Sequence, residues 1–298
     1  MSNNFCENNY WLNIDKPLGY SSAKIVAIIK RITKAKKVGH AGTLDPLASG
    51  ILPIAINKAT KTCSYITDHN KKYRFTISWG EFRDTDDAEG KITEQNNIRP
   101  STIDIIISLP FFIGKIEQTP PNFSAIKING KKSYEMARNN EEFSLVKRNV
   151  EIHQINLISN NDSSAQFEIS CSKGTYVRSF ARELSQKLGV CGYISSLRRL
   201  KVGNFNEDTA ISLDKLKNIV NYCCPSDSMM HLRDVLHFMS EVELDDQKAQ
   251  KVRNGQVIKF SENILQLYGE LPVKIIGNGA VIGIGKFSNN NLKPINIF

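Results

Sequence analysis

The sequence lacks any long hydrophobic run. In the 298-residue chain, the most apolar stretch extends from Ile103 to Gly114 and is interrupted by Asp104, Ser108 and Pro110. A helix needs roughly 18 to 20 apolar residues to cross a bilayer, so no membrane-spanning segment is predicted. Residues 1–9 are polar and lack the apolar centre of a signal peptide. We therefore expect a cytoplasmic protein without membrane association.

Cysteine patterns that hold zinc are also missing. None of the six cysteines belongs to a Cys-x-x-Cys pair, and the adjacent Cys223 and Cys224 have no matching cluster of His or Cys. We expect reduced thiols and no structural metal. Neither G-x-G-x-x-G nor G-x-x-x-x-G-K-[ST] occurs, so no motif indicates a dinucleotide or a P-loop nucleotide.

Acidic residues are too few to balance the basic ones. Lys and Arg number 39 and Asp and Glu number 30, which gives a net charge of +9 and a pI of about 9.2. This excess favours a polyanionic partner, RNA or DNA. A solvated lysine-rich surface is the alternative explanation of the same numbers.

Helix and strand patterns follow each other without a regular βαβ rhythm. Ser21 or Ser22 is expected to cap an amphipathic helix, and residues 72–79 and 165–171 alternate as half-buried strands. Thr175 is expected to cap a second helix that stops at Gly189. This mixture predicts an α+β fold with a mixed sheet.

A change of pattern near Ser240 predicts a second, smaller domain. A short helix is expected at 245–253, and short strands at 256–260, 272–276 and 280–285, with glycines between them. About 60 residues of this kind indicate a β-rich domain near the lower size limit of independent stability.

An isolated carboxylate follows a basic stretch near the N-terminus. From Lys16 to Leu44 there are seven basic residues and no acidic one, and Asp45 then follows in the segment VGHAGTLDPLASG, residues 38–50. Three glycines and a proline indicate a shaped loop. Such a loop would hold a bound polyanion against a carboxylate. The alternative is a turn aspartate that caps its own backbone.

This loop resembles the active-site loop of the TruB family, the tRNA pseudouridine-55 synthases. The resemblance extends over residues 11–205, in blocks that have the family's order and spacing. Ser49 stands where the family usually has Thr, which exchanges one small hydroxyl for another. The similar blocks are DKPLGYSS (15–22), GHAGTLDP (39–46), KKYR (71–74), DTDDAEG (84–90), QTPPNFSAIK (118–127), YEMAR (134–138), KGTYVRS (173–179) and LRRL (197–200).

The resemblance implies a reaction and a domain plan. Uridine in the tRNA T-loop would be isomerised to pseudouridine: the N1–C1′ bond breaks, the base turns, and C5 joins C1′. No redox change or group transfer occurs, so no cofactor is expected. Residues 1–239 would form the catalytic domain, with an RNA-clasping insertion at about 115–150, and residues 240–298 a PUA-like RNA-binding domain. The segment after Pro46 and the insertion after Ile92 resemble stand-alone bacterial members, which implies a monomer with no obligatory protein partner.

The resemblance also assigns catalytic roles. Asp45 would be the essential carboxylate and nucleophile, with Arg178 as the cation beside it. Tyr73 would stack on the uracil ring and take part in removing the C5 proton. Without the resemblance, Arg178 reads as a solvated helix residue and Tyr73 as ordinary core. The sequence leaves three alternatives open: Asp45 attacks C1′, Asp45 attacks C6, or Asp45 promotes a glycal route.

Five further residues are assigned to the substrate site by the same resemblance. The target base must leave its stack, and His40 would fill or contact the space it vacates. Tyr176 and Leu197 would form pocket walls, Lys16 would bind substrate, and Asp87 would partner Arg178. From composition alone, the acidic cluster around Asp87 reads as a solvated turn in preference to a metal loop.

Phosphate contacts are expected from exposed basic side chains. An RNA-binding module or tRNA chaperone without essential catalysis is the alternative function. An RNA glycosidase is a third, but it would need a second acid or base on the opposite face of the sugar, and none is evident. The candidate phosphate contacts are the stripe from Lys30 to Lys37, Lys127, Lys131, Lys132, Arg138, Arg198, Arg199 and Lys201.

Overall fold

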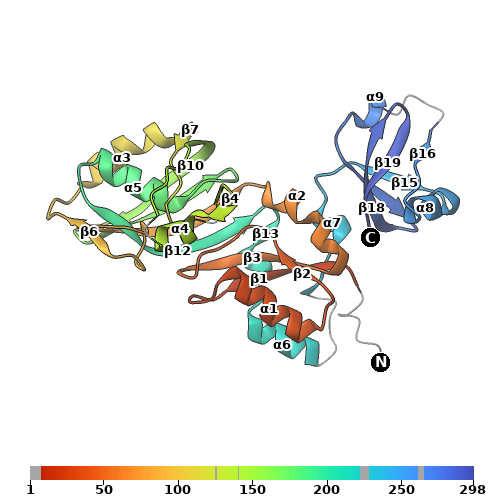
Figure 1. The fold of residues 1–298 in the computed structure, drawn as a ribbon, viewed down its shortest axis with the longest axis horizontal. Coiled ribbons are helices and arrows are strands. Elements are labelled where there is room, and N and C mark those ends of the chain that lie inside the picture. The colour runs from red at the N-terminus through yellow and green to blue at the C-terminus, as the bar shows by residue number, and fades with distance from the viewer. Residues whose placement is uncertain (1–7, 125, 140, 222–227, 261–264) are drawn as a thin grey trace.

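A large mixed sheet forms the centre of the molecule (Figure 1). The computed structural model describes residues 8–124, 126–139, 141–221, 228–260 and 265–298. The strand order is β14-β1-β3-β12-β4-β11-β10-β7, with β2 beside β3 and β13 beside β12, and only β3 and β12 pair in parallel among these strands. The strands are β1 (Tyr10–Lys16), β2 (Val38–His40), β3 (Ala48–Ile56), β4 (Lys71–Trp79), β7 (Gly114–Gln118), β10 (Arg148–Asn160), β11 (Ser164–Cys171), β12 (Gly192–Val202), β13 (Phe205–Asn206) and β14 (Met230–His231).

Alternation along the central strands builds the main core. In β4 the residues on one face, such as Tyr73 and Phe75, are buried, as are Phe167 and its face of β11. Helix α5 (Val177–Lys187) covers this face, and the ring of Phe180 packs edge-on against Phe75 and Phe167. Removing so large a buried ring costs about 3–5 kcal/mol, so the core fixes α5 firmly over β4.

All three predicted helices form, but one begins differently. Ser21 caps α1 (Ser22–Thr33), and its side chain accepts a hydrogen bond from the backbone N–H of Lys24. Thr175 is not the cap of α5, because Tyr176 occupies that position and supplies no side-chain cap. Gly189 follows the helix with a φ of +68°, which suits glycine at a helix end. The remaining helices are α2 (Cys63–Thr67), α3 (Thr102–Ser108), α4 (Ser133–Arg138), α6 (Leu213–Asn221), α7 (Leu232–Val235), α8 (Asp246–Arg253), α9 (Leu265–Tyr268) and the 3₁₀ turns η1 (Asn57–Thr62), η2 (Leu109–Phe112) and η3 (Glu207–Thr209).

A second, five-stranded sheet follows β14 in the chain (Figure 1, right). This sheet and α8 form a separate hydrophobic core. Ile284 of the sheet does not belong to that core and packs with Trp11 and Phe205 of the larger body. Strands lie in the three predicted regions. The first and last strands along the chain, Glu241–Leu244 and Asn291–Ile297, were not predicted. In spatial order the strands are β15 (Glu241–Leu244), β17 (Val273–Gly277), β18 (Ala280–Ser288), β19 (Asn291–Ile297) and β16 (Ile258–Lys259). The α+β fold class with a small β-rich C-terminal part is confirmed.

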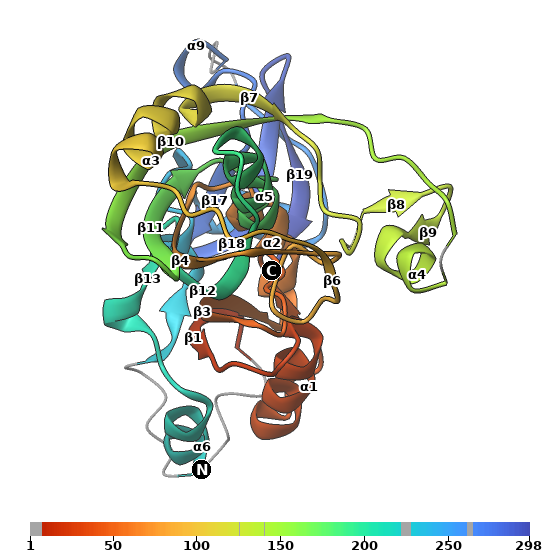
Figure 2. The same cartoon turned by 90° about the vertical axis from the view of Figure 1, so that its left-hand side faces the viewer.

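Two insertions leave the main sheet. Strands β5 (Glu81–Arg83) and β6 (Ile92–Gln95) form a hairpin near β12. Strands β8 (Lys127–Ile128) and β9 (Lys131–Lys132), with α4, extend away from the body (Figure 2, right). We refer to residues 126–139 as the projecting segment.

Two predicted absences, of a membrane-spanning helix and of a metal site, can be compared with the structure for the residues that it describes. Within them, no helix combines the length and the hydrophobicity of a bilayer span. No three His, Cys, Asp or Glu side chains of this part of the chain are grouped so that they could hold a metal ion. Cys63, Cys171 and Cys191 are free thiols, whereas Cys6, Cys223 and Cys224 lie outside the described residues.

Candidate active site

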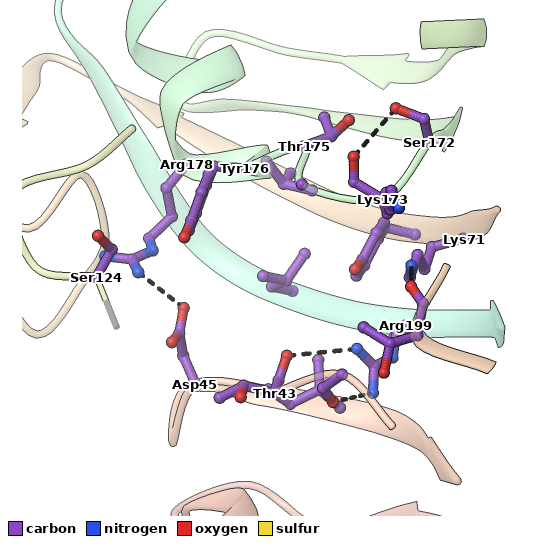
Figure 3. Close-up of a pocket in the computed structure, with 17 residues that line it drawn as sticks. Thr43, Asp45, Lys71, Ser124, Ser172, Lys173, Thr175, Tyr176, Arg178 and Arg199 are labelled. Atoms are coloured by element: carbon purple, nitrogen blue, oxygen red, sulfur yellow. Dashed lines mark hydrogen bonds and ion pairs between the residues drawn. The ribbon is translucent and has the colours of Figure 1, made fainter. Parts of the chain in front are cut away.

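A cavity of about 310 Å³ opens between the segment that carries Asp45 and the start of α5 (Figure 3). Strands β4 and β12 contribute to its lining through Tyr73 and Leu197. Tyr176 and Arg178 line it from the α5 side. The structure thus brings together five of the eight residues that the sequence assigned to the site.

The backbone around Asp45 is held by a continuous series of hydrogen bonds. We call residues 41–47 the Asp45 loop. Every carbonyl from Gly42 to Pro46 accepts at least one donor, so the position of the Asp45 carboxylate is fixed by the surrounding fold. The donors are Arg199 for Gly42 and Thr43 (3.0 and 3.4 Å), the Ser22 hydroxyl for Leu44 (2.9 Å), the Ala48 N–H for Asp45 (3.0 Å), and the Gly19 N–H and Lys16 Nζ for Pro46 (2.9 and 3.5 Å).

Arg178 forms an ion pair with Asp45. Its Nη2 lies 3.0 Å from Asp45 Oδ2, and the Arg178 side chain is only 6% exposed while that of Asp45 is 39% exposed. The same guanidinium donates to the carbonyls of Thr85 and Phe123, each at 2.9 Å. The alternative of a solvated Arg178 is therefore wrong. An ionised carboxylate facing the cavity, backed by a buried cation, can act as a nucleophile.

The acidic turn beside Arg178 is only partly solvated. Asp87 is 4% exposed and lies 3.7 Å from Arg178 Nη1, which confirms the predicted pair. Asp86 is also buried and pairs with Arg182, one turn further along α5. Burial raises the pKa of Asp86 to about 6, although Arg182 acts in the opposite direction. The solvated-turn interpretation fails for Asp86 and Asp87, because two arginines on one face of α5 draw these carboxylates into the interior, and it holds for the exposed Asp84 and Glu89.

Tyr73 serves both the core and the cavity. It is 9% exposed, packs in the main core and also lines the cavity. Burial raises the pKa of its phenol, and the neighbouring Arg199 guanidinium opposes that rise. The core interpretation and the site interpretation of Tyr73 are therefore compatible.

Arg199 was predicted as an exposed RNA phosphate contact, but it is buried in the cavity wall. It is 1% exposed, and its Nε donates to the carbonyl of Ile51 at 2.7 Å. Strand alternation explains the error: Arg198 points outward and pairs with Asp15 and Glu207, so Arg199 must point inward. Neighbouring positions in a strand cannot both face the same partner.

Three of the assigned residues lie outside the lining. Lys16 is fully buried, and its ammonium donates to the carbonyls of Pro17 and Tyr20 as well as to the Asp45 loop. Burial lowers its pKa to about 8. His40 lies on β2 directly before the loop, and burial lowers its pKa, which favours the neutral imidazole near pH 7. Asp87 pairs with Arg178 and does not itself line the cavity.

Lys71 lines the cavity and belongs to the KKYR block, but the sequence did not assign it to the site. It is 7% exposed, and its ammonium donates to the carbonyls of Thr67 and His69. Burial lowers its pKa to about 8. With Arg178 and Arg199, it makes the wall of the cavity basic around the single carboxylate of Asp45. This charge suits the ribose-phosphate of a nucleotide.

Comparison with known proteins decides the family. Residues 30–177 match the TruB family pseudouridylate synthase N-terminal domain, residues 178–244 the tRNA pseudouridylate synthase B C-terminal domain, and residues 240–297 the pseudouridine synthase II TruB C-terminal region. The chain belongs to the TruB family. It is a tRNA pseudouridine synthase of the isomerase class, as the resemblance implied.

Relatives of this length are found in several bacteria. The chain is 44% identical to tRNA pseudouridine synthase B of Ehrlichia ruminantium over 296 residues, which are 97% of this chain and 98% of the relative. It is 40% identical to the enzyme of Nitrobacter winogradskyi, covering 97% of this chain and 82% of the relative.

Solved structures share the fold at much lower identity. One is an H/ACA RNP bound to a substrate RNA containing 2′-deoxyuridine, with a TM-score of 0.72, 20% identity and coverage of 97% of this chain and 84% of that chain. A Cbf5-Nop10-Gar1 complex has the same TM-score and coverage at 22% identity. These similarities support the architecture alone.

Proposed function

We propose that this enzyme converts the uridine at position 55, in the T-loop of tRNA, into pseudouridine, with Asp45 as its nucleophile. The observation that carries the proposal is the Asp45–Arg178 ion pair, held at the cavity by a loop whose carbonyls from Gly42 to Pro46 all accept hydrogen bonds. Attack by the carboxylate on the nucleotide leads to cleavage of the N1–C1′ bond. The base turns, C5 bonds to C1′, the bond to the Asp45 carboxylate breaks, C5 loses its proton and N1 gains one. Substrate and product therefore have the same atoms, and the reaction needs no cofactor.

The remaining cavity residues receive roles from their positions. Tyr73 is placed to stack on the uracil and to exchange the C5 proton, because its ring lines the cavity and its phenol has a polar tip. Tyr176 and Leu197 are walls for the same nucleotide. Gln118 fixes Tyr176 by bonding both its backbone N–H and its carbonyl, at 2.8 and 3.1 Å.

The three residues outside the lining act in other ways. The base must leave its stack before it can enter a cavity of this kind, and His40 is proposed to contact the space that it vacates. Lys16 and Asp87 are proposed to position the Asp45 loop and Arg178, in place of direct contact with substrate.

RNA would be held by regions on either side of the cavity. We propose residues 1–239 as the catalytic domain, about 115–150 as an insertion that clasps the T-arm, and 240–298 as an RNA-binding domain. Supporting observations are the exposed Lys127, Lys131 and Arg138 on the projecting segment, and the net charge of +9. We further propose that the enzyme acts as a monomer without a protein partner and also assists tRNA folding.

A synthetic T-arm RNA tests the function directly. Wild-type protein is incubated with the stem-loop without added cofactor or metal, and pseudouridine is mapped along the product. Conversion confined to the T-loop uridine supports the proposal. Release of free uracil would indicate a glycosidase instead. Tight binding without either product would indicate a binding module or a chaperone.

A further inference from the structure

Arg199 is an unusual residue for the interior of a sheet. It is 1% exposed, and no carboxylate of a described residue lies within ion-pair distance of its guanidinium. Burial lowers its pKa, as expected for a cation removed from water without an acidic partner. A buried charge of this kind is costly and, when it lies in a cavity wall, indicates a functional site.

The guanidinium joins two separate parts of the site. Its Nε donates to the carbonyl of Ile51 in β3 at 2.7 Å, while its Nη atoms donate to the carbonyls of Gly42 and Thr43 at 3.0 and 3.4 Å (Figure 3). The fork of an arginine can make these bonds together because its donors are fixed in one plane. Arg199 therefore ties the Asp45 loop to the central strands, three residues before the carboxylate.

Its other neighbour is Tyr73. The two residues are cross-strand partners in β4 and β12, and the guanidinium opposes the rise that burial causes in the pKa of the phenol. The backbone is equally tight on the opposite side, where a Cβ at Gly50 would lie 2.2 Å from the Arg199 carbonyl oxygen. Arg199 is thus held between the Asp45 loop and the Tyr73 side chain.

We propose that Arg199 is a positioning residue for the isomerisation, which sets the distance between the Asp45 carboxylate and the Tyr73 phenol around the bound uridine. This inference rests on the proposed function. It concerns the chemical step, because Arg199 bonds to the Asp45 loop, lies beside Tyr73 and is shielded from the exposed surface where RNA would first bind.

The test separates the rate of the chemical step from RNA affinity. Arg199→Met removes both the fork and the charge, and Arg199→Lys keeps the charge but loses the fork. Arg74→Met is the matched control, since Arg74 lies on neighbouring β4, faces outward and pairs with Glu168. Each variant is assayed in single turnover at saturating T-arm RNA, with the RNA dissociation constant measured in parallel.

We expect Arg199→Met to slow the chemical step about 100-fold, the loss that a misplaced reacting group can cause, with RNA affinity unchanged. Arg199→Lys should be slowed less, and Arg74→Met should retain the wild-type rate. If Tyr73→Phe abolishes one limb of the pH–rate profile, that limb should move to higher pH in Arg199→Met, because the guanidinium no longer opposes the rise in the phenol pKa. If Arg199→Met does not fold, the folded Arg199→Lys variant decides through the same comparison.

Two results would overturn the inference. One is a wild-type single-turnover rate in both Arg199 variants, and the other is a loss of RNA affinity equal to the loss of rate. Inactivity of the wild type on every uridine of the T-arm would instead reject the proposed function, so the two failures are distinguishable.

Discussion

The Asp45 loop and the projecting segment differ sharply in how they are held. The loop has donors for each carbonyl from Gly42 to Pro46, and all but the neighbouring Ala48 come from two distant parts of the chain, residues 16–22 and Arg199. Within the described residues, the hydrogen bonds of the projecting segment are largely its own or reach only to its root, as between Ser133 and Ser124. The proposed nucleophile thus lies on backbone with many restraints, and the proposed RNA clasp on backbone with few.

Arg178 connects the two regions. Its Nη2 lies 3.0 Å from the Asp45 carboxylate and 2.9 Å from the carbonyl of Phe123, at the root of the projecting segment. A displacement of that root would therefore reach the carboxylate through one guanidinium. Substitutions at Arg178 and changes in either region can test this difference between a rigid and a loosely held region.

The largest effect is expected from Arg178→Met, which removes the link. Loss of one partner from a buried ion pair costs about 3–5 kcal/mol of stability, and turnover should fall by about 100-fold or more because Asp45 loses its cation. Arg182→Met is the matched control, since it breaks the Asp86 pair one turn away without touching Asp45. Unfolding free energies and single-turnover rates would be compared. Equal rate losses in both variants would mean that stability alone is responsible.

Replacing the projecting segment by a glycine-serine linker should affect binding and leave the core intact. We expect T-arm affinity to weaken about tenfold, equivalent to about 1.4 kcal/mol, with an unchanged thermal midpoint. Binding assays and melting curves of the same sample would show this. Wild-type affinity in the linker variant would mean that RNA is held elsewhere.

A smaller and graded effect is expected from the basic stripe, which is exposed but follows a rigid helix. Replacing Lys34, Lys36 and Lys37 with alanine should lower the slope of log affinity against log salt by roughly 0.7–0.9 for each phosphate contact removed. Titrations at several salt concentrations measure this slope. An unchanged slope would place the RNA away from the stripe.

The smallest effect concerns the junction to the C-terminal sheet. Arg233 and Lys274 hold the pKa of Glu241 down at about 2, below its usual 4.5. The stability from this group is therefore present above pH 4.5 and lost as the pH falls towards 2. Glu241→Gln should remove that part of the acid dependence of the melting temperature, and the exposed Glu243→Gln should not. Identical acid profiles in wild type and Glu241→Gln would contradict this.

Local patterns predicted the elements whose burial alternates regularly. Strand β4 follows from period-two alternation and helix α1 from apolar residues at i, i+3, i+4 and i+7. The blocks of family similarity located Asp45, Arg178 and Tyr73. The N-cap of α5 was misassigned because Thr175 resembles a cap, whereas the chain there is fixed by the bonds of Gln118 to Tyr176. Strand β19 was missed because proline and asparagine dilute its pattern.

Residues whose role depends on distant partners could not be predicted. Asp86 and Asp87 read as solvent-exposed in a polar turn, and only the packing of α5 brings Arg178 and Arg182 to them. Arg199 read as a surface cation because its acceptors are carbonyls about 150 positions earlier. A strict reading of strand alternation at Arg198 and Arg199 would have separated the two.

The most direct measurement compares wild type with Asp45→Asn on the same T-arm RNA, recording RNA affinity and pseudouridine yield together. The amide keeps the shape of the side chain but is not a nucleophile. The account predicts near-wild-type RNA affinity and no pseudouridine from the variant. Pseudouridine formed by Asp45→Asn at the wild-type rate would contradict it.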